Sequence, residues 1–374
     1  MTPQELIKLH PHIFALAPDN VLEMYCDHHM LSTMRSCEAK FYEEQLAHVG
    51  SKTQRYFSLE FGQWFHECLE CYYGCFKTTG AAPVLDTWVV AALALWHEYD
   101  LDFFAPLPGT KTADMYGDAK KYYNLCKWDA KGAITRLLIQ YYAFYANQRM
   151  RVVDTEISFG RAREVPLGQL LVKGYPVRCY LTGRIDLLVD NGAKIGPVDH
   201  KTTARFDGYE SNDFDPHEGI TGYIYAINSI LSDNAEARSS GSDKYAYPTG
   251  IPQVCLSGWI YHVSLADDEP RFKPTPVYKT HQQLDEYRLR QLRTFRRIYE
   301  LATASQKLEN YGAVEMNTGL CNNLYNSACP FRELHRQPFS QREGTITQFY
   351  EIKPAWNPAA PPVKRAKHEE EVTK

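Results

Sequence analysis

Two aspartates and a lysine lie on either side of a turn signal and have the chemistry of a divalent-metal site. Asp186 lies in the run LTGRIDLLVD, and Asp199 and Lys201 lie in the run PVDHKT. Asn191-Gly192 between the two runs is a strong signal for a two-residue β-hairpin turn. The three side chains should therefore belong to two paired strands.

The register of this hairpin puts the three side chains on one face. With a two-residue turn, Asp186 faces Pro197, which makes Asp186 and Asp199 diagonal neighbours about 7 Å apart. Lys201 is two residues beyond Asp199 and projects on the same side. Hard cations such as Mg²⁺ and Mn²⁺ take carboxylate oxygens, and a lysine beside them can orient or deprotonate a water. The pattern indicates phosphodiester hydrolysis; the alternative is a surface hairpin with scattered charges.

The surrounding elements follow from the spacing of apolar residues. A three-to-four spacing predicts helices, and short β-rich runs predict strands. We expect helices over residues 58–76, 86–99, 130–149, 219–231 and 282–304, strands between 152–202 and 254–265, and loops over 312–345. A helical half, a strand meander and further helices predict an α/β or α+β fold.

The two runs resemble the second and third motifs of the PD-(D/E)XK nucleases, in particular the RecB-like exonuclease branch. Gly62-Gln-Trp-Phe-His66 resembles the early G-x-x-x-H motif of that branch, and Glu156 resembles its glutamate on the preceding strand. Tyr223 resembles the tyrosine of Q-x-x-x-Y, but Gly219 occupies the glutamine position. The resemblance implies an α/β fold with a restriction-endonuclease-like core, a mixed central sheet flanked by helices, and helical insertions.

The resemblance also implies roles for these residues. Asp186, Asp199, the backbone carbonyl of His200 and the imidazole of His66 would hold Mg²⁺ or Mn²⁺, and Lys201 would activate the attacking water. A nitrogen ligand suits Mn²⁺ somewhat better than Mg²⁺. Glu156 would act as an outer-shell or second-metal residue. The alternatives are that His66 borders an apolar helical stripe and that Glu156 is a surface carboxylate at a strand end.

Some members of this family carry an iron–sulfur cluster. The resemblance assigns its ligands here to Cys37, Cys321, Cys329 and His335, which would hold a [4Fe-4S] cluster. The same four residues could form a Cys₃His zinc site, because Zn²⁺ takes four such ligands in a tetrahedron. The third interpretation is that no cluster remains and that the cysteines are ordinary buried thiols. Three further cysteines are predicted to pack in the core on the apolar side of one helix: Cys68, Cys71 and Cys75.

DNA contacts must come from a local basic patch, because the net charge is −4. Arg290, Arg293 and Arg297 share one face of the helix predicted over 282–304 and could follow a phosphate backbone. The alternative is a solvated face that pairs with neighbouring acids. Tyr223 is the fourth candidate DNA contact, from the resemblance.

The domain organisation and location follow from composition. We expect a single nuclease domain over residues 1–353, with a helical insertion at about residues 45–150, and a disordered tail over 354–374. The sequence has ten cysteines, no secretory signal and no apolar stretch long enough to cross a membrane, which predicts a cytoplasmic protein (in the host cytoplasm if phage-encoded).

The predicted function is a Mg²⁺- or Mn²⁺-dependent DNA exonuclease. It would act on DNA ends or single strands in recombination, repair or phage DNA metabolism, with a helicase or recombination protein as a further partner. Two alternatives stay open: an endonuclease or nickase on the same core, and a decayed module that binds DNA or a recombination partner without cutting.

Overall fold

The computed structural model of the chain describes residues 2–52, 55–146, 150–192, 194–203, 218–239, 254–264, 271–304, 314–318 and 329–354. The chain divides into two compact units, each built from separate segments. The first unit contains residues 1–54, 158–183 and 281–359, and the second contains residues 55–157, 184–280 and 360–374. Strand β6 (Tyr175–Asp190) passes through both units. The tail expected beyond Pro354 lies outside the described residues.

The first unit places strand β2 (Leu22–Asp27) parallel to β6, with Leu22 opposite Val177 and Asp27 opposite Thr182. β1 (Phe14–Leu16) pairs antiparallel with β2, and β5 (Pro166–Val172) pairs antiparallel with β6. Lys173 and Gly174 form the turn between β5 and β6, and both have positive φ, at 51° and 84°. Two successive residues of positive φ are typical of the type I′ turn that suits a twisted hairpin.

Helices complete the first unit. They are α1 (Pro3–Leu9), α2 (His28–Ser36), α3 (Glu38–Phe41), the π-helix η1 (Tyr42–Leu46), α10 (His281–Ala304), α12 (Arg332–Arg336) and α13 (Phe339–Phe349). α10 packs against β5 and α2. Strands β3 (Val49–Ser51) and β10 (Tyr350–Ile352) pair antiparallel above a small cluster that contains Phe331 and Leu334. The loop prediction for residues 312–345 was wrong where α12 and α13 form.

The second unit contains the other part of the sheet. β6 and β7 (Ile195–Thr203) are antiparallel, β7 and β8 (Ser257–Ser264) are parallel, and β8 and β9 (Arg271–Tyr278) are antiparallel. β4 (Arg151–Phe159) pairs with β6. β7 and β8 approach closely at Gly196, where an added Cβ would stand 2.3 Å from the backbone oxygen of Ser257. Both parallel and antiparallel pairs occur, so the prediction of a mixed sheet is confirmed.

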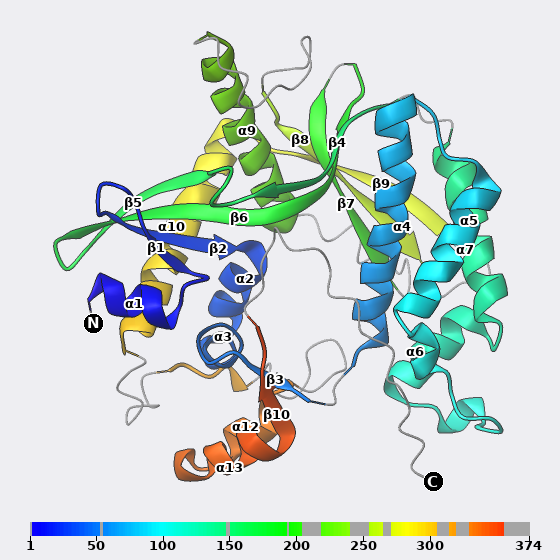
Figure 1. Cartoon of the computed structure of the whole chain (residues 1–374), viewed down its shortest axis with the longest axis horizontal. Helices are drawn as coiled ribbons and strands as arrows, with labels where there is room; N and C mark the ends of the chain where they lie inside the picture. Colours follow the sequence, from blue (N-terminus) through cyan, green and yellow to red (C-terminus); the bar gives the residue numbers. More distant parts are fainter. Residues whose placement is uncertain are drawn as a thin grey trace. The chain divides into compact units, whose positions relative to one another are not determined.

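Aromatic helices flank this part of the sheet. They are α4 (Phe57–Thr79), α5 (Leu85–Glu98), the 3₁₀ helices η2 (Leu101–Phe104) and η3 (Thr112–Asp114), α6 (Gly117–Cys126) and α7 (Ala130–Tyr145) (Figure 1). Buried Trp64 and Trp88 donate their indole N–H groups to the carbonyls of Ala92 and Cys68, at 2.9 and 2.8 Å. α9 (Glu218–Ser239) packs against β7 and β8. The predicted α/β fold, with a mixed sheet flanked by helices, is confirmed.

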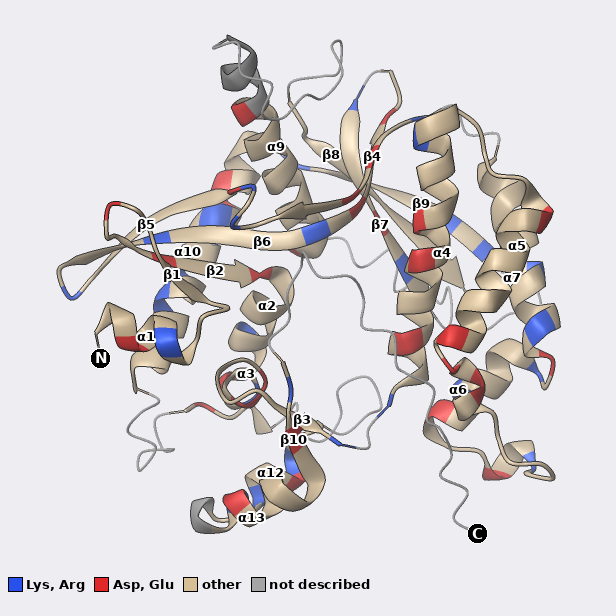
Figure 2. Cartoon of the chain, in the orientation of Figure 1, with Lys and Arg blue, Asp and Glu red and all other residues tan. Residues whose placement is uncertain are grey.

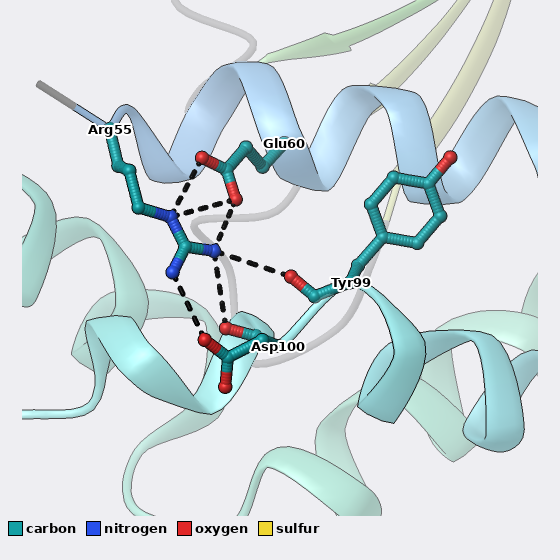
Figure 3. Close-up of polar contacts among 4 residues, drawn as sticks. All are labelled: Arg55, Glu60, Tyr99 and Asp100. Atoms are coloured by element: carbon teal, nitrogen blue, oxygen red, sulfur yellow. Dashed lines mark hydrogen bonds and ion pairs between the residues drawn. The ribbon is translucent and has the colours of Figure 1, made fainter. Parts of the chain in front are cut away.

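An arginine clamp fixes the start of α4 (Figure 3). The Arg55 guanidinium donates to both carboxylate oxygens of Glu60, with Nη2 at 2.5 Å from Oε2, and to Oδ2 of Asp100 at 3.1 Å. It also donates to the carbonyls of Tyr99 and Asp100, at 3.3 and 3.4 Å. Its cation lies 4.2 Å from the ring centre of Phe103. The clamp joins the beginning of α4 to the segment that follows α5.

Charge is mixed across each unit. Figure 2 shows Lys and Arg interspersed with Asp and Glu on the helices and strands. In the described part of the chain, no helix is long and apolar enough to cross a membrane.

Candidate active site

The site begins where β6 and β7 stop pairing. The last pair of the ladder is Leu187 opposite Val198, and Leu188 faces Pro197. The prediction that Asp186 faces Pro197 was wrong by two residues, because the ladder begins with Asp190 opposite Ile195, which makes the connection between the strands longer than the two-residue turn expected. Backbone N–H of Asn191 donates to the Lys194 carbonyl at 3.1 Å across this connection.

A shift of two residues preserves which face each side chain occupies. Continued by one residue beyond its last pair, the observed register would set Asp186 opposite Asp199, where the diagonal arrangement was expected. Residues two apart on a strand share a face, so the prediction that Asp186, Asp199 and Lys201 start from one side of the sheet is retained.

Asp186 gathers three nitrogen groups around one oxygen. Its Oδ2 accepts a hydrogen bond from the backbone N–H of His200 at 3.1 Å, and it lies 3.3 Å from Nδ1 of His66. Nδ1 of His200 lies 3.9 Å from the same oxygen. Burial alone would raise the pKa of Asp186, but the histidines and Lys201 outweigh it and hold the pKa well below its usual range. Asp186 is therefore ionised at neutral pH.

His66 reaches Asp186 from α4. Burial alone would lower the pKa of His66, but the Asp186 carboxylate outweighs burial and raises it. The structure thus brings His66 into contact with Asp186, an acid that the resemblance assigns to the same metal. His200 differs, because burial lowers the pKa of its imidazole to about 3 and keeps the ring neutral.

Asp199 and Lys201 form the second half of the site. Asp199 is 2% exposed, and its Oδ2 lies 3.0 Å from Nζ of Lys201. Burial alone would lower the pKa of Lys201, but Asp199 and Asp186 outweigh it and raise that pKa. The lysine is therefore a cation whose side chain is 46% exposed.

Glu156 lies beside this pair of acids on β4. Its φ is +48°, which a residue with a side chain rarely adopts within a strand. Oε2 of Glu156 lies 2.9 Å from Nε of Arg184. Burial and the nearby Asp186 carboxylate raise the pKa of Glu156 to about 7, against the opposing effect of Arg184. A strained backbone at a buried acid is typical of functional sites.

Arg184 was not among the candidate residues. It lies two residues before Asp186 and so shares its strand face, which is the signal that the sequence offered. Its guanidinium pairs with Glu156 and so offsets negative charge beside Asp186.

The two acids offer the carboxylate oxygens that Mg²⁺ and Mn²⁺ take, and the imidazole of His66 suits Mn²⁺ better than Mg²⁺. Carboxylate oxygens, a backbone carbonyl and one imidazole suit a borderline-hard divalent ion. Among the described residues, no three His, Cys, Asp or Glu side chains are gathered closely enough to hold a metal ion as they stand. Metal binding would therefore exchange the His66–Asp186 and Lys201–Asp199 contacts for contacts to the ion.

The candidate DNA contacts lie on other elements. Tyr223 is half-buried on α9. On α10 the Arg293 side chain is exposed, whereas Nε and Nη2 of Arg297 donate to the Glu38 carboxylate at 2.5 and 2.8 Å. Arg290 is half-buried on the same helix. Arg297 thus pairs with an acid, as the alternative interpretation of this face expected.

The candidate cluster ligands that the structure describes lie in the first unit. Cys37 is buried at the start of α3, and Cys329 packs against the cluster that contains Phe331. Nε2 of buried His335 lies 3.5 Å from Oε1 of Glu43. Cys321 lies outside the described residues. Within the described ranges, Cys37, Cys329 and His335 do not form a group able to hold a metal.

The cysteines of α4 do not all pack in the core. Cys68 is buried, Cys75 is half-buried and Cys71 is exposed. The core prediction is therefore confirmed for Cys68, wrong for Cys71 and only partly met by Cys75.

Comparison with known proteins gives one family. The family model described as the PD-(D/E)XK nuclease superfamily matches residues 28–334, which is most of the chain. No curated protein matches the chain.

Proposed function

The chain belongs to the PD-(D/E)XK nuclease superfamily, and we propose that it is a Mg²⁺- or Mn²⁺-dependent DNA exonuclease with Asp186, Asp199 and Lys201 at its active site. The observation that carries this proposal is the pair of acidic side chains, Asp186 and Asp199, beyond the end of the β6–β7 ladder. One acid touches His66 and the other touches Lys201. Carboxylate oxygens are the ligands that Mg²⁺ and Mn²⁺ take, so two such side chains at neighbouring strand ends favour binding of a divalent cation.

The side chains divide the work between holding a cation and placing the phosphate. Asp186, Asp199, the His200 carbonyl and His66 would hold the ion. A bound Mg²⁺ or Mn²⁺ would polarise the phosphate and lower the pKa of a water. The Lys201 ammonium, held 3.0 Å from Asp199, would stabilise negative charge on the phosphate oxygens and orient the attacking water. Glu156 and Arg184 would set the charge beside Asp186.

Exonuclease action is proposed from the resemblance of the motifs to the RecB-like branch. The expected substrates are DNA ends or single strands, and the expected setting is recombination, repair or phage DNA metabolism with a helicase or recombination protein as partner. Tyr223, Arg290 and Arg293 are proposed DNA contacts. Arg297 is the weakest of the four candidates, because Glu38 already occupies its guanidinium.

The test compares DNA forms and matched variants. Purified protein is incubated with labelled linear single strands, linear duplexes and supercoiled circles in Mg²⁺ or Mn²⁺. We expect shortening of linear DNA only, and a loss of about 10³-fold or more in rate for Asp199→Asn and Lys201→Met. Lys194→Met is the matched control, because Lys194 lies outside the site and contacts the ring of Tyr278.

The outcomes separate the alternatives. Relaxation or nicking of the circles would assign an endonuclease or nickase. DNA binding without cleavage of any form, in either metal, would assign the decayed binding module, for which Gly219 at the glutamine position is the supporting observation. Equal rates for Lys201→Met and Lys194→Met would remove Lys201 from the mechanism.

The [4Fe-4S] cluster at Cys37, Cys321, Cys329 and His335 is a separate proposal from the resemblance. Visible absorbance of anaerobically purified protein and its iron content test it, and Cys37→Ala should abolish both. Zinc without iron would favour the Cys₃His alternative, and neither metal would assign the cysteines as ordinary thiols.

A further inference from the structure

A chain of three buried polar groups lies beneath the site, on the side of β7 that faces the helices of the second unit. The hydroxyls of Tyr73 and Tyr141 are 2.6 Å apart, and the Tyr141 hydroxyl lies 3.0 Å from Nε2 of His200. The three residues are 2%, 0% and 1% exposed, and they come from α4, α7 and β7. Aromatic rings surround them, among them Tyr145 and Tyr261.

Such a chain needs a reason beyond stability. Polar groups taken out of water recover at best a small net free energy from their hydrogen bonds, and apolar residues of similar shape would fill the same space. The polar chain adds a fixed assignment of donors and acceptors, because each group that donates a proton to its neighbour requires that neighbour to accept.

The order follows from Asp186. Nδ1 of His200 lies 3.9 Å from Oδ2 of Asp186, too far for a hydrogen bond but close enough for its charge to matter. A neutral imidazole carries its proton on one nitrogen only. With a proton on Nδ1, the positive end of the N–H dipole faces the Asp186 carboxylate and is attracted to it. Without that proton, the lone pair of Nδ1 would face the carboxylate and be repelled by it. The favoured tautomer therefore has Nδ1–H, so Nε2 accepts from Tyr141 and Tyr141 accepts from Tyr73.

Residue 200 is also tied to the site through its backbone. Its N–H donates to Asp186 Oδ2 at 3.1 Å, so the peptide and the ring of His200 address the same oxygen. A ring free to rotate about its χ2 angle would present either nitrogen to Asp186 and would loosen the position of this peptide.

We propose that Tyr73 and Tyr141 are positioning residues that fix the tautomer and orientation of His200 and thereby hold Asp186 in place to bind the metal. This inference rests on the proposed function for the identity of the site. It assigns no contact with substrate to either tyrosine. It adds a second role for His200, whose side chain was not a candidate for any role in the sequence.

The helices supply matched controls. Tyr72 precedes Tyr73 on α4, and Tyr145 follows Tyr141 by one turn of α7. Both control rings are buried in the same aromatic core, and among the described residues their hydroxyls have no hydrogen-bond partner. Each pair of Tyr→Phe variants therefore removes one buried hydroxyl from the same helix, and only one member of each pair interrupts the chain.

The first measurement needs neither metal nor DNA. Nitrogen-15 NMR of histidine-labelled protein distinguishes the two imidazole tautomers, with His200→Gln used to assign the signal. We expect His200 to be in the Nδ1–H form in the wild type, in Tyr72→Phe and in Tyr145→Phe. Tyr141→Phe should give a mixture. An Nε2–H form in the wild type, or an unchanged spectrum in Tyr141→Phe, would overturn the proposal.

The second measurement is Mn²⁺ affinity, followed by the paramagnetic resonance of free Mn²⁺. Residues that orient metal ligands typically change affinity about 10- to 100-fold, and we expect a weakening in that range for Tyr141→Phe. Tyr73→Phe should weaken binding less, because Tyr141 can still donate to His200. Saturating Mn²⁺ should restore cleavage by both variants without a change in KM for DNA. Equal Mn²⁺ affinity in Tyr141→Phe and Tyr145→Phe would also overturn the proposal.

Failure of the proposed function looks different. A wild-type protein that binds Mn²⁺ and shows the expected tautomer but cuts no DNA would refute the nuclease activity and leave the positioning role intact. If the wild type binds no Mn²⁺, the link to metal binding is refuted whatever the tautomer.

Discussion

Removal of the Arg55 guanidinium should destabilise the second unit strongly. Arg55→Ala leaves Glu60 charged at a position where its side chain is only 12% exposed, and breaking a buried pair in this way costs about 3–5 kcal/mol. The Asp100 side chain is 55% exposed, so its pair contributes about 1 kcal/mol or less. The cation over Phe103 adds roughly 0.5–1 kcal/mol. The stranded Glu60 charge therefore dominates the expected loss.

Urea unfolding followed by tryptophan fluorescence measures this loss, because Trp64, Trp88 and Trp96 report on the core beside the clamp. With an m-value of about 2–3 kcal/mol/M, the cost of about 3–5 kcal/mol for the stranded charge alone should lower the transition midpoint by about 1–2.5 M. Adding Glu60→Gln to Arg55→Ala should recover part of the loss, because the stranded charge is gone. Lys121→Ala is the control, since it removes an exposed pair with Asp118 and should cost less than about 0.5 kcal/mol.

Two results would refute this reasoning. A loss below about 1 kcal/mol for Arg55→Ala would mean that Glu60 is solvated once its partner is removed. A double variant no more stable than Arg55→Ala would mean that the cost does not come from the unpaired carboxylate.

Three other perturbations have defined outcomes. Burial lowers the pKa values of His10 and His12 to about 4, so the unfolded chain takes up protons at a higher pH than the folded chain does. The free energy of unfolding should therefore fall by on the order of 1–3 kcal/mol as the pH drops from 6.5 to 4. Melting curves recorded at several pH values test this, and His10→Phe should reduce the dependence of stability on pH. Gly196→Ala should cost about 1–3 kcal/mol in urea unfolding, because its Cβ meets β8 backbone, whereas Gly74→Ala, with open space on α4, should not destabilise. Glu156→Gly should keep or raise the melting temperature by relieving a positive φ, yet lower cleavage at least about tenfold; an unchanged rate would remove Glu156 from the site.

The long helices were predictable because their apolar residues repeat every three to four positions. The helix expected over 58–76 forms as Phe57–Thr79, and the helix expected over 282–304 forms as His281–Ala304. Strand β2 gave no such signal, since all six of its residues are buried and their polarity does not alternate. The tight two-residue turn formed at Lys173-Gly174 and not at Asn191-Gly192, because tertiary pairing overrode local turn preference.

The part of the site that depends on which strand residues share one face of the sheet was predictable. Asp186, Asp199 and Lys201 depend only on which residues share a face, and parity survived an error of two residues in register. His66 came from a resemblance, and the structure places its ring against Asp186. Contacts that depend on how helices pack could not be predicted. Neither the hydroxyl of Tyr141 nor its distance to His200 has any counterpart in local spacing.

The division of the chain sets an order for its synthesis. The first unit needs residues 1–54, but its helix α10 begins only at His281, after every segment of the second unit up to Thr280 has left the ribosome. At about 5–20 residues per second, the N-terminal segment must wait on the order of ten seconds or more before its last partners exist. During that interval β5 and α2 lack the helix that packs on them. The nascent chain is thus most exposed to aggregation or to chaperone capture during this interval, when all residues of its candidate active site have already been synthesised.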